Sequence, residues 1–260
     1  MIEVRRSARL VSWGNAALAG RVSPDTAAER VVGDDPPHRV LGLPGDADAV
    51  SLPLALARLR STGGRGLRLA LPVPGDPAGL PGPPAFNTEA LVAGEAVLVV
   101  PAPGSPAHGL VPALLGSDAS AQGSSVLWRA APVVSGEAPG QPTLAEAERT
   151  LREVLLECTE ALVALDVARW RPEVADALRQ LREDRPMQDA LAPGYSGRAA
   201  SVLSLARKVD AIAELAGQDG GAAASATSLS GRAALLRRLS TAGRHAQVAA
   251  YNAVLEPARP

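Results

Sequence analysis

A short acidic segment with a histidine is the strongest local candidate for chemistry in this chain. Gly33 is followed by Asp34, Asp35, two prolines and His38. Two carboxylates and an imidazole this close together could bind a metal ion or exchange a proton with a substrate. The alternative is a loop between a helix and a strand, in which aspartate supports the turn and proline stiffens it.

A second set of polar residues follows short apolar runs that are typical of strands. Loops rich in proline and glycine occupy residues 44–48, 73–87 and 101–108. If the strands are parallel, these loops meet at the carboxyl edge of the sheet, where open α/β sheets bind ligands. Asn87 would also bring a helix N-terminus, whose amides suit an anion. The candidate ligand-binding residues in these loops are Asp46, Asp76, Asn87 and His108.

The end of the chain is basic, with four arginines and no acidic residue between positions 228 and 251. A basic helix there could bind nucleic acid or an acidic protein. It could equally lie against an acidic helix of the same chain, and four charges are few for a phosphate footprint. The candidate partner-binding residues are Arg232, Arg237, Arg238 and Arg244.

Sequence signatures of familiar catalytic sites are absent. The chain has no phosphate-binding G-x-x-x-x-G-K-[ST], no G-x-S-x-G and no H-E-x-x-H. A zinc site made of imidazoles would require all three histidines, and His245 lies within the last predicted helix. We therefore predict no metal site and no cofactor, and whether the protein is an enzyme stays open.

The first half of the chain must position the acidic segment and the loops. Four apolar runs at 39–43, 66–73, 96–100 and 125–131 have centres 28 or 29 residues apart. A helix with two loops needs about that length to return the chain to a parallel strand. We predict a mostly parallel four-stranded sheet with helices. The alternative is a mixed sheet in which the 66–73 and 96–100 runs pair antiparallel, because the helix between them is short.

Helices of this half are predicted from their caps and their apolar spacing. One covers residues 7–19, and a second begins at Ser23-Pro24, a cap followed by proline at the first helical position. Ser51 caps a third, Asn87 caps a fourth, and residues 109–115 form a short fifth.

Long helical patterns fill the second half. Thr143 and Glu146 form a capping box, and apolar residues at helical spacing continue to residue 165. Further helices begin near 172, 196 and 230, which predicts a four-helix bundle. We therefore expect an α/β domain over residues 1–140 and an all-α domain over residues 143–256.

Composition narrows the class of protein. Hydrophobic residues make up 47% of the chain, and the formal net charge of −1 argues against a generally polyanionic partner. Cys158 is the only cysteine, so the chain can form no intrachain disulfide. The chain also contains no run of 18 apolar residues, the length that could span a membrane. We predict a cytoplasmic protein without a membrane partner.

Several short segments resemble one family. Trp13-Gly14-Asn15-Ala16, Val22-Ser23-Pro24-Asp25, Pro37-His38-Arg39-Val40 and Gly42-Leu43-Pro44-Gly45 are similar to a conserved hypothetical family of high-GC actinobacteria. The resemblance covers most of the first half. It implies a bacterial cytoplasmic origin and carries no activity, ligand or catalytic residue.

The leading functional hypothesis is a non-enzymatic interaction or regulatory protein that binds a protein partner or itself. The first alternative is an enzyme or small-molecule-binding protein with its site among the loops 44–48, 73–87 and 101–108. The second alternative is a weak binder of nucleic acid or of an acidic protein through the last helix, with nucleic acid the less favoured partner.

Overall fold

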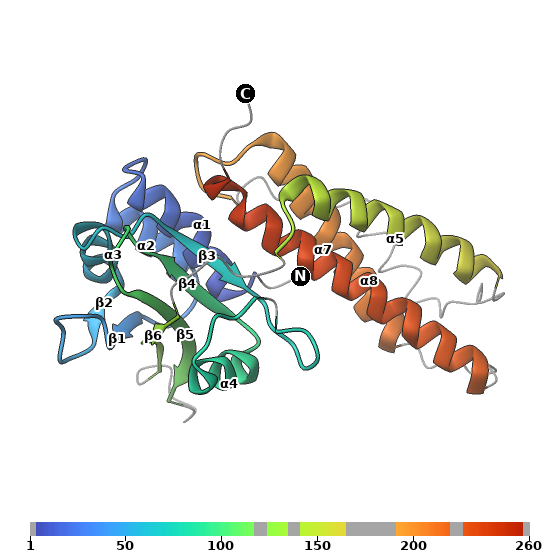
Figure 1. Ribbon diagram of the computed structural model, residues 1–260, viewed down its shortest axis with the longest axis horizontal. Helices are drawn as coiled ribbons and strands as arrows, with labels where there is room; N and C mark the ends of the chain where they lie inside the picture. The colour runs from blue at the N-terminus through green and yellow to red at the C-terminus, as the bar shows by residue number, and fades with distance from the viewer. Residues whose placement is uncertain are drawn as a thin grey trace. The chain divides into compact units, whose positions relative to one another are not determined.

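The computed structural model describes residues 4–77, 79–116, 124–134, 141–164, 191–218 and 226–256. The chain separates into two compact units. The N-terminal unit comprises residues 3–141, 189–196 and 254–260, and the helical unit comprises residues 1–2, 142–188 and 197–253. Each unit is described by itself (Figure 1).

The N-terminal unit is a six-stranded sheet with helices on both faces. Its strands lie in the spatial order β2-β1-β6-β5-β4-β3. They are β1 (His38–Leu41), β2 (Val50–Ser51), β3 (Gly66–Ala70), β4 (Ala96–Val100), β5 (Ala107–Leu115) and β6 (Ser125–Val133). The helices of this unit are α1 (Arg6–Leu18), α2 (Pro24–Val32), α3 (Leu52–Ser61) and α4 (Pro84–Ala93).

The sheet is mixed, so the prediction of a mostly parallel four-stranded sheet is wrong. Only β1 and β6 pair parallel, whereas β3–β4, β4–β5, β5–β6 and β1–β2 pair antiparallel. The alternative is confirmed, because Gly66 pairs with Val100 and Ala70 with Ala96 in an antiparallel register. The regular spacing of the apolar runs suggested parallel crossovers. Instead, the strand that follows α4 is β4, which pairs antiparallel with β3.

The predicted helix at residues 109–115 is also wrong, because this segment is part of strand β5. Pro112 sits within β5 without breaking the sheet. The β4 register described for β5 ends at Leu110, so on that side Pro112 has no ladder partner to lose. On its other side Pro112 lies opposite Trp128 of β6.

The three helix starts predicted from caps in this unit have different outcomes. Ser23 accepts a hydrogen bond from the backbone N–H of Thr26 at 3.0 Å and begins α2, as predicted. Ser51 precedes α3 but makes no capping hydrogen bond. Asn87 is not a cap, because α4 begins earlier, after Pro83.

The two faces of the sheet carry different helices. A Cβ added to Gly14 of α1 would meet Leu67 of β3, so α1 packs tightly on one face, and α2 and α3 accompany it. On the opposite face, Phe86 of α4 lies directly over Gly109 of β5. Ala70, Ala96, Leu98 and Val111 complete the core beneath α4. Figure 1 shows α4 separated from the other three helices of this unit.

Strand β3 forms one edge of the sheet, and α1 protects it. The side-chain amide of Asn15 donates to the carbonyl of Leu67 at 2.8 Å and accepts from the Leu67 N–H at 2.7 Å. The amide thus makes both hydrogen bonds that a neighbouring strand would offer Leu67. The opposite edge strand, β2, is only two residues long.

The helical unit contains α5 (Leu144–Ala164), α7 (Gly197–Gln218) and α8 (Ala226–Asn252). A short 3-10 turn, η2 (Ala253–Leu255), follows α8 and leads into the last residues of the N-terminal unit. Helix α8 packs against both α5 and α7. The capping box is confirmed, since Glu146 accepts from the Thr143 N–H at 2.9 Å and Thr143 Oγ1 accepts from the Glu146 N–H at 3.3 Å. The helix predicted near residue 172 lies outside the described residues.

Candidate functional site

The mixed topology distributes the predicted loop residues over different parts of the N-terminal unit. Strands β1, β4 and β6 run in the same direction, so their carboxyl ends lie on one side of the sheet. Strand β3 runs in the opposite direction, and its carboxyl end lies on the other side. The loops after β1 and β4 therefore lie on the same side of the sheet, and the loop after β3 begins on the other side. A parallel sheet was the premise of a single ligand edge, and that premise fails.

The contacts described for Asp46, Asp76 and Asn87 lie within their own part of the unit. Asp46 forms an ion pair with Arg58 of α3. The backbone of Asp76 exchanges two hydrogen bonds with Val73 in a tight turn, at 2.9 and 3.0 Å. Asn87 accepts a hydrogen bond from the Gly82 N–H at 3.0 Å.

His108 lies on the other face of the sheet from Asn87. Its neighbour Gly109 faces Phe86 of α4, and successive residues of a strand point to opposite faces. The structure therefore does not bring these two side chains into one cleft, and a ligand-binding role for the loop residues stays a prediction.

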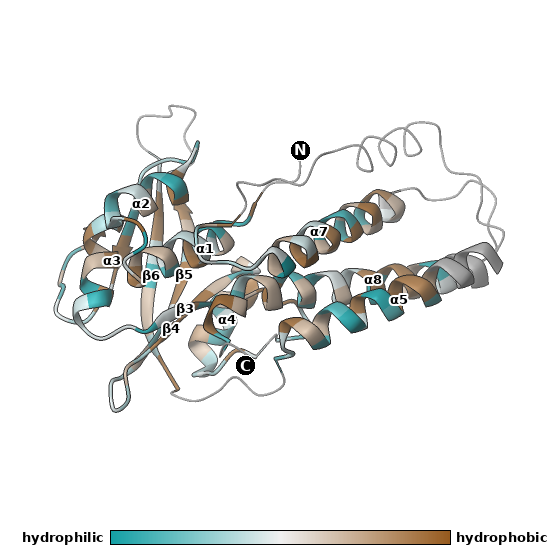
Figure 2. Ribbon diagram, turned by 90° about the horizontal axis from the view of Figure 1, so that it is seen from above, coloured by the Kyte–Doolittle hydropathy of each residue, from teal (hydrophilic) through white to brown (hydrophobic). Residues whose placement is uncertain are grey.

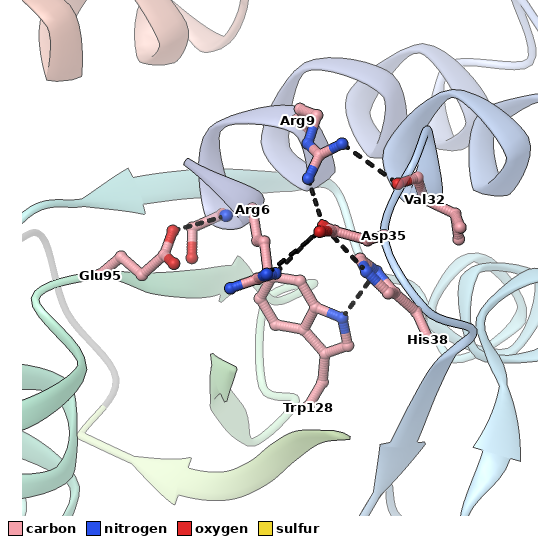
Figure 3. Close-up of polar contacts among 8 residues, drawn as sticks. Arg6, Arg9, Val32, Asp35, His38, Glu95 and Trp128 are labelled. Atoms are coloured by element: carbon pink, nitrogen blue, oxygen red, sulfur yellow. Dashed lines mark hydrogen bonds and ion pairs between the residues drawn. The ribbon is translucent and has the colours of Figure 1, made fainter. Parts of the chain in front are cut away.

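The acidic segment behaves differently, because the structure builds a cluster around one of its carboxylates (Figure 3). Asp34 is exposed, whereas Asp35 is half-buried and His38 is buried. We define the Asp35 cluster as five residues that α1, the α2–β1 loop, β1 and β6 supply. They are Arg6, Arg9, Asp35, His38 and Trp128.

Two arginines of α1 neutralise Asp35. Arg6 donates through Nε to Asp35 Oδ2 at 3.0 Å and through Nη2 to Oδ1 at 3.1 Å, a bidentate pairing. Arg9 forms an ion pair with Asp35 Oδ2 and also donates to the Val32 carbonyl at 3.1 Å. Burial alone would raise the pKa of Asp35, but the hydrogen bond from Arg6 and the charge of Arg9 outweigh it and lower the pKa.

His38 is held neutral in the same cluster. Burial lowers the pKa of His38 to about 4, although the charge of Asp35 opposes this effect. The indole N–H of Trp128 donates to His38 Nδ1 at 3.3 Å, so the proton of the neutral imidazole belongs on Nε2. Nε2 faces Asp35 Oδ2 at 3.5 Å. Protonation of Nδ1 would set two N–H donors against each other.

The cluster joins elements more readily than it performs proton transfer. Its carboxylate is committed to two guanidinium groups, and the His38 side chain has no exposed surface. It ties α1 and the α2–β1 loop to β1 and β6. The sequence drew attention to Asp35 and His38 but not to Arg6, Arg9 or Trp128, which lie far away in the chain. The spacing of Arg6 and Arg9, which places them on one side of a helix, was the available signal.

Within the part of the chain that the structure describes, no group of three or more histidine, cysteine, aspartate or glutamate residues could hold a metal ion. The same residues include no helix long and apolar enough to cross a membrane.

The four arginines of α8 occupy two kinds of environment. Arg232 and Arg244 are buried, and Arg232 donates to the Ala216 carbonyl of α7 at 2.7 Å. Arg238 pairs with Glu157 of α5 at 2.6 Å, and Arg237 is exposed. The intramolecular alternative therefore accounts for Arg238, and a partner-binding role for the group stays a prediction.

A further candidate is the part of the sheet beside α4. Helix α4 covers β4 and β5, and none of the described helices of this unit covers β6 and β1 on the same face. We define the open face as the six residues that β1, β5 and β6 present there. They are Arg39, Leu41, Ala113, Leu115, Leu127 and Arg129.

Burial alternates between the open face and the reverse side along β1 and along residues 126–129 of β6. His38, Val40, Val126 and Trp128 point to the face that α1–α3 cover, and all four are buried. On the open face the side chain of Arg129 is 53% exposed. The contrast does not extend to the end of β5, where Leu115 on the open face is 45% exposed and Leu114 on the reverse side is 57% exposed. Figure 2 shows the hydrophobic colouring of β5 and β6. The open face is thus an apolar surface with two arginines, and sequence periodicity alone did not identify it.

Comparisons with known proteins give a family and no activity. The N-terminal domain model of the Rv1486c-like proteins matches residues 7–144, and their C-terminal domain model matches residues 145–248. The uncharacterized protein Rv1486c of Mycobacterium tuberculosis is 33% identical over 98% of both chains. The uncharacterized protein MAV321 of Mycobacterium avium is 38% identical over 112 residues, which are 36% of this chain and 37% of that protein.

No solved structure matches this chain. The two family models together cover most of its length, and the mycobacterial relative aligns from end to end. The resemblance to a conserved actinobacterial family is therefore confirmed, and the chain belongs to the Rv1486c-like protein family.

Proposed function

We propose that this protein is a non-enzymatic interaction protein that binds another protein chain through the open face. The observation that carries the proposal is the contrast in burial along β1 and β6. Along His38–Leu41 and Val126–Arg129, the residues on one face are buried and the alternate residues on the other face are half-buried or exposed. An apolar surface left uncovered beside a helix is typical of an interaction site.

The dimensions of the open face suit a helix. Packed helices lie about 8–10 Å apart, and neighbouring strands lie about 4.8 Å apart. One helix therefore covers about two strands. Because α4 covers β4 and β5, the next position for a helix lies over β6 and β1.

The Asp35 cluster supports an interaction role over a catalytic one. Its carboxylate is neutralised by α1, and its imidazole has no exposed surface. The charged groups on the open face are more accessible, since Arg39 is exposed and Arg129 meets Glu89 of α4 at 3.6 Å, with both side chains near half exposure.

The remaining parts of the proposal concern organisation. We propose that residues 1–140 form an α/β domain and that residues 143–256 form a four-helix bundle, with α5, α7 and α8 as three of its helices. The single cysteine and the many internal ion pairs are compatible with a cytoplasmic location.

A photo-crosslinking experiment tests the proposal. A benzophenone amino acid placed at Leu127, on the open face, is expected to attach to a bound protein chain in living actinobacterial cells. The matched control is the same amino acid at Leu54 of α3, which is 43% exposed on a different surface. A discrete crosslinked protein from position 127 and none from position 54 supports the proposal. Equal products from both positions, or none from position 127, contradict it.

A further inference from the structure

The structure assigns an occupant to the open face: helix α4 of a second copy of this chain. The inference rests on the proposed function, because it names the protein chain that binds there. Each copy carries a helical ridge, α4, immediately beside a surface of similar width that none of the described helices of this unit covers. Two copies related by a two-fold axis would each place the ridge on the other copy's open face.

The outward surface of α4 has the apolar character that such contact requires. Val92 is 86% exposed, more than any other large hydrophobic residue among those described. Ala85, Thr88 and Glu89 are exposed as well, and with Val92 they lie at spacings of three, four and seven residues. These positions form one stripe along the helix. The stripe faces away from Phe86 and Ala90, which α4 buries against its own sheet.

Charge favours the same arrangement. Glu89 is the only charged residue in α4, and the open face contains two arginines and no acidic residue. Within one copy, Arg129 meets Glu89 at 3.6 Å, whereas Arg39 has no acidic partner among the contacts described and donates to the Ala49 carbonyl. In the dimer, Glu89 on α4 of the other copy would bring a second carboxylate to the open face. That carboxylate would lie on the positively charged side of the open face, where Arg39 is.

Symmetry closes the assembly at two copies. In a two-fold interface the same patch is used on both partners, so every contact occurs twice and no binding surface is left for a third chain. Val92 of one copy would be buried against Leu41 and Leu127 of the other, and the reciprocal contact would form at the same time. The helix spans about 15 Å at 1.5 Å per residue, which is shorter than the nine-residue strand β6.

Engineered disulfides test this contact directly. The chain has one cysteine, Cys158, which is buried, and Cys158→Ala gives a cysteine-free background. Val92→Cys and Leu127→Cys are introduced into separate preparations, which are then mixed and mildly oxidised. The mixture is expected to give a disulfide-linked dimer in at least tenfold excess over either variant alone. A mixture of Leu54→Cys with Leu127→Cys is the matched control, expected to give none.

The oligomeric state and its charge dependence provide an independent measurement. Light scattering of the unmodified protein is expected to give twice the chain mass of 26.5 kDa. Glu89→Arg is expected to raise the dimer dissociation constant about tenfold, because it places like charges together at two equivalent sites. Glu29→Arg makes the same charge change on exposed α2 and is expected to alter the constant less than about twofold.

The outcomes separate this inference from the proposed function. A monomer at about 100 μM with no disulfide between Val92→Cys and Leu127→Cys overturns self-association. If the photo-crosslinker at Leu127 then attaches to a different protein, the proposed function stands and only the occupant is wrong. If the crosslinker attaches to nothing, both fail. Should Glu29→Arg weaken the dimer as much as Glu89→Arg, the dimer interface lies elsewhere and the inference is wrong.

Discussion

The two faces of the N-terminal sheet are built from alternate residues of the same strands, yet they meet different surroundings. Trp128 and Leu127 are neighbours in β6, and Trp128 is fully buried whereas Leu127 is half-buried. Among the described helices of this unit, three cover the first face and the short helix α4 covers part of the second. The side with more helices contains the charged cluster, and the side with fewer keeps its arginines accessible.

This difference shows where charge stabilises the fold and where it is available for binding. On the covered face, the carboxylate of Asp35 accepts from two guanidinium groups and faces an imidazole. Removing one member would leave a partly buried charge uncompensated. On the open face, Arg129 and Glu89 are both about half exposed, so water already solvates them and their pairing adds little stability.

The largest expected difference compares the two neighbours in β6. Trp128→Ala is expected to lower the free energy of unfolding by about 4 kcal/mol, because it opens a cavity and removes the N–H that His38 Nδ1 accepts. Leu127→Ala is expected to lower it by about 1 kcal/mol, since that side chain is only half-buried. Urea titration followed by circular dichroism measures both. Equal losses would show that the open face is as well packed as the covered one.

A smaller effect is expected within the acidic segment. Asp35→Asn keeps the shape of the side chain but leaves Arg6 and Arg9 without their carboxylate, and we expect a loss of about 3 kcal/mol. Asp34→Asn removes the same charge from an exposed position and should change the free energy of unfolding by less than about 0.5 kcal/mol. The same urea titration compares the two variants. If Asp34→Asn proved the more damaging, the cluster would not be what holds α1.

Measured per pH unit, the smallest of these effects is a pH dependence that belongs to the covered face. His38 has a pKa of about 4 in the folded protein and about 6.5 when unfolded, so between these values the unfolded chain binds the extra proton. Its stabilising contribution is therefore complete above pH 6.5 and is lost as the pH falls toward 4. The slope should approach about 1.4 kcal/mol per pH unit.

His38→Asn provides the control, because it cannot titrate in this range. Urea unfolding at several pH values between 6.5 and 4 should show a flatter dependence for the variant than for the natural protein. Asp35 contributes only near the acidic end of this window, since its pKa is lowered below the usual value of 3.8 and its own stabilising effect is lost mainly at lower pH. An identical slope in both proteins would mean that other groups carry the pH dependence.

Local features of this fold could be predicted from nearby residues. Ser23 with Pro24 specifies the start of α2, and the pair Thr143 and Glu146 specifies the start of α5. A cap is a hydrogen bond between residues three positions apart, so the signal lies in adjacent sequence. The placement of Asn87 was wrong for a related reason, because Pro84 offers an earlier first helical position.

The candidate site was only partly predictable. Asp35 and His38 stand three positions apart, and their proximity was visible in the sequence. The partners that decide their chemistry are 26 to 90 residues away: Arg6, Arg9 and Trp128. The sequence does not show that β1 pairs with β6 or where α1 lies. Without this information, a carboxylate near a histidine is equally consistent with a catalytic pair and with a structural one.

By itself, the sequence determined most of the described helices, the caps of α2 and α5, four of the apolar runs that become strands and the family resemblance, because each depends on residue types at short spacing. Only the tertiary structure decided that the sheet is mixed, that Asp35 is neutralised and that none of the described helices of this unit covers β6 and β1 beside α4. Strand direction depends on which distant runs pair, and neighbouring runs of similar length and hydrophobicity allow more than one pairing. Which side chains stay exposed likewise depends on how all the helices and strands pack, so it is decided only by the tertiary structure.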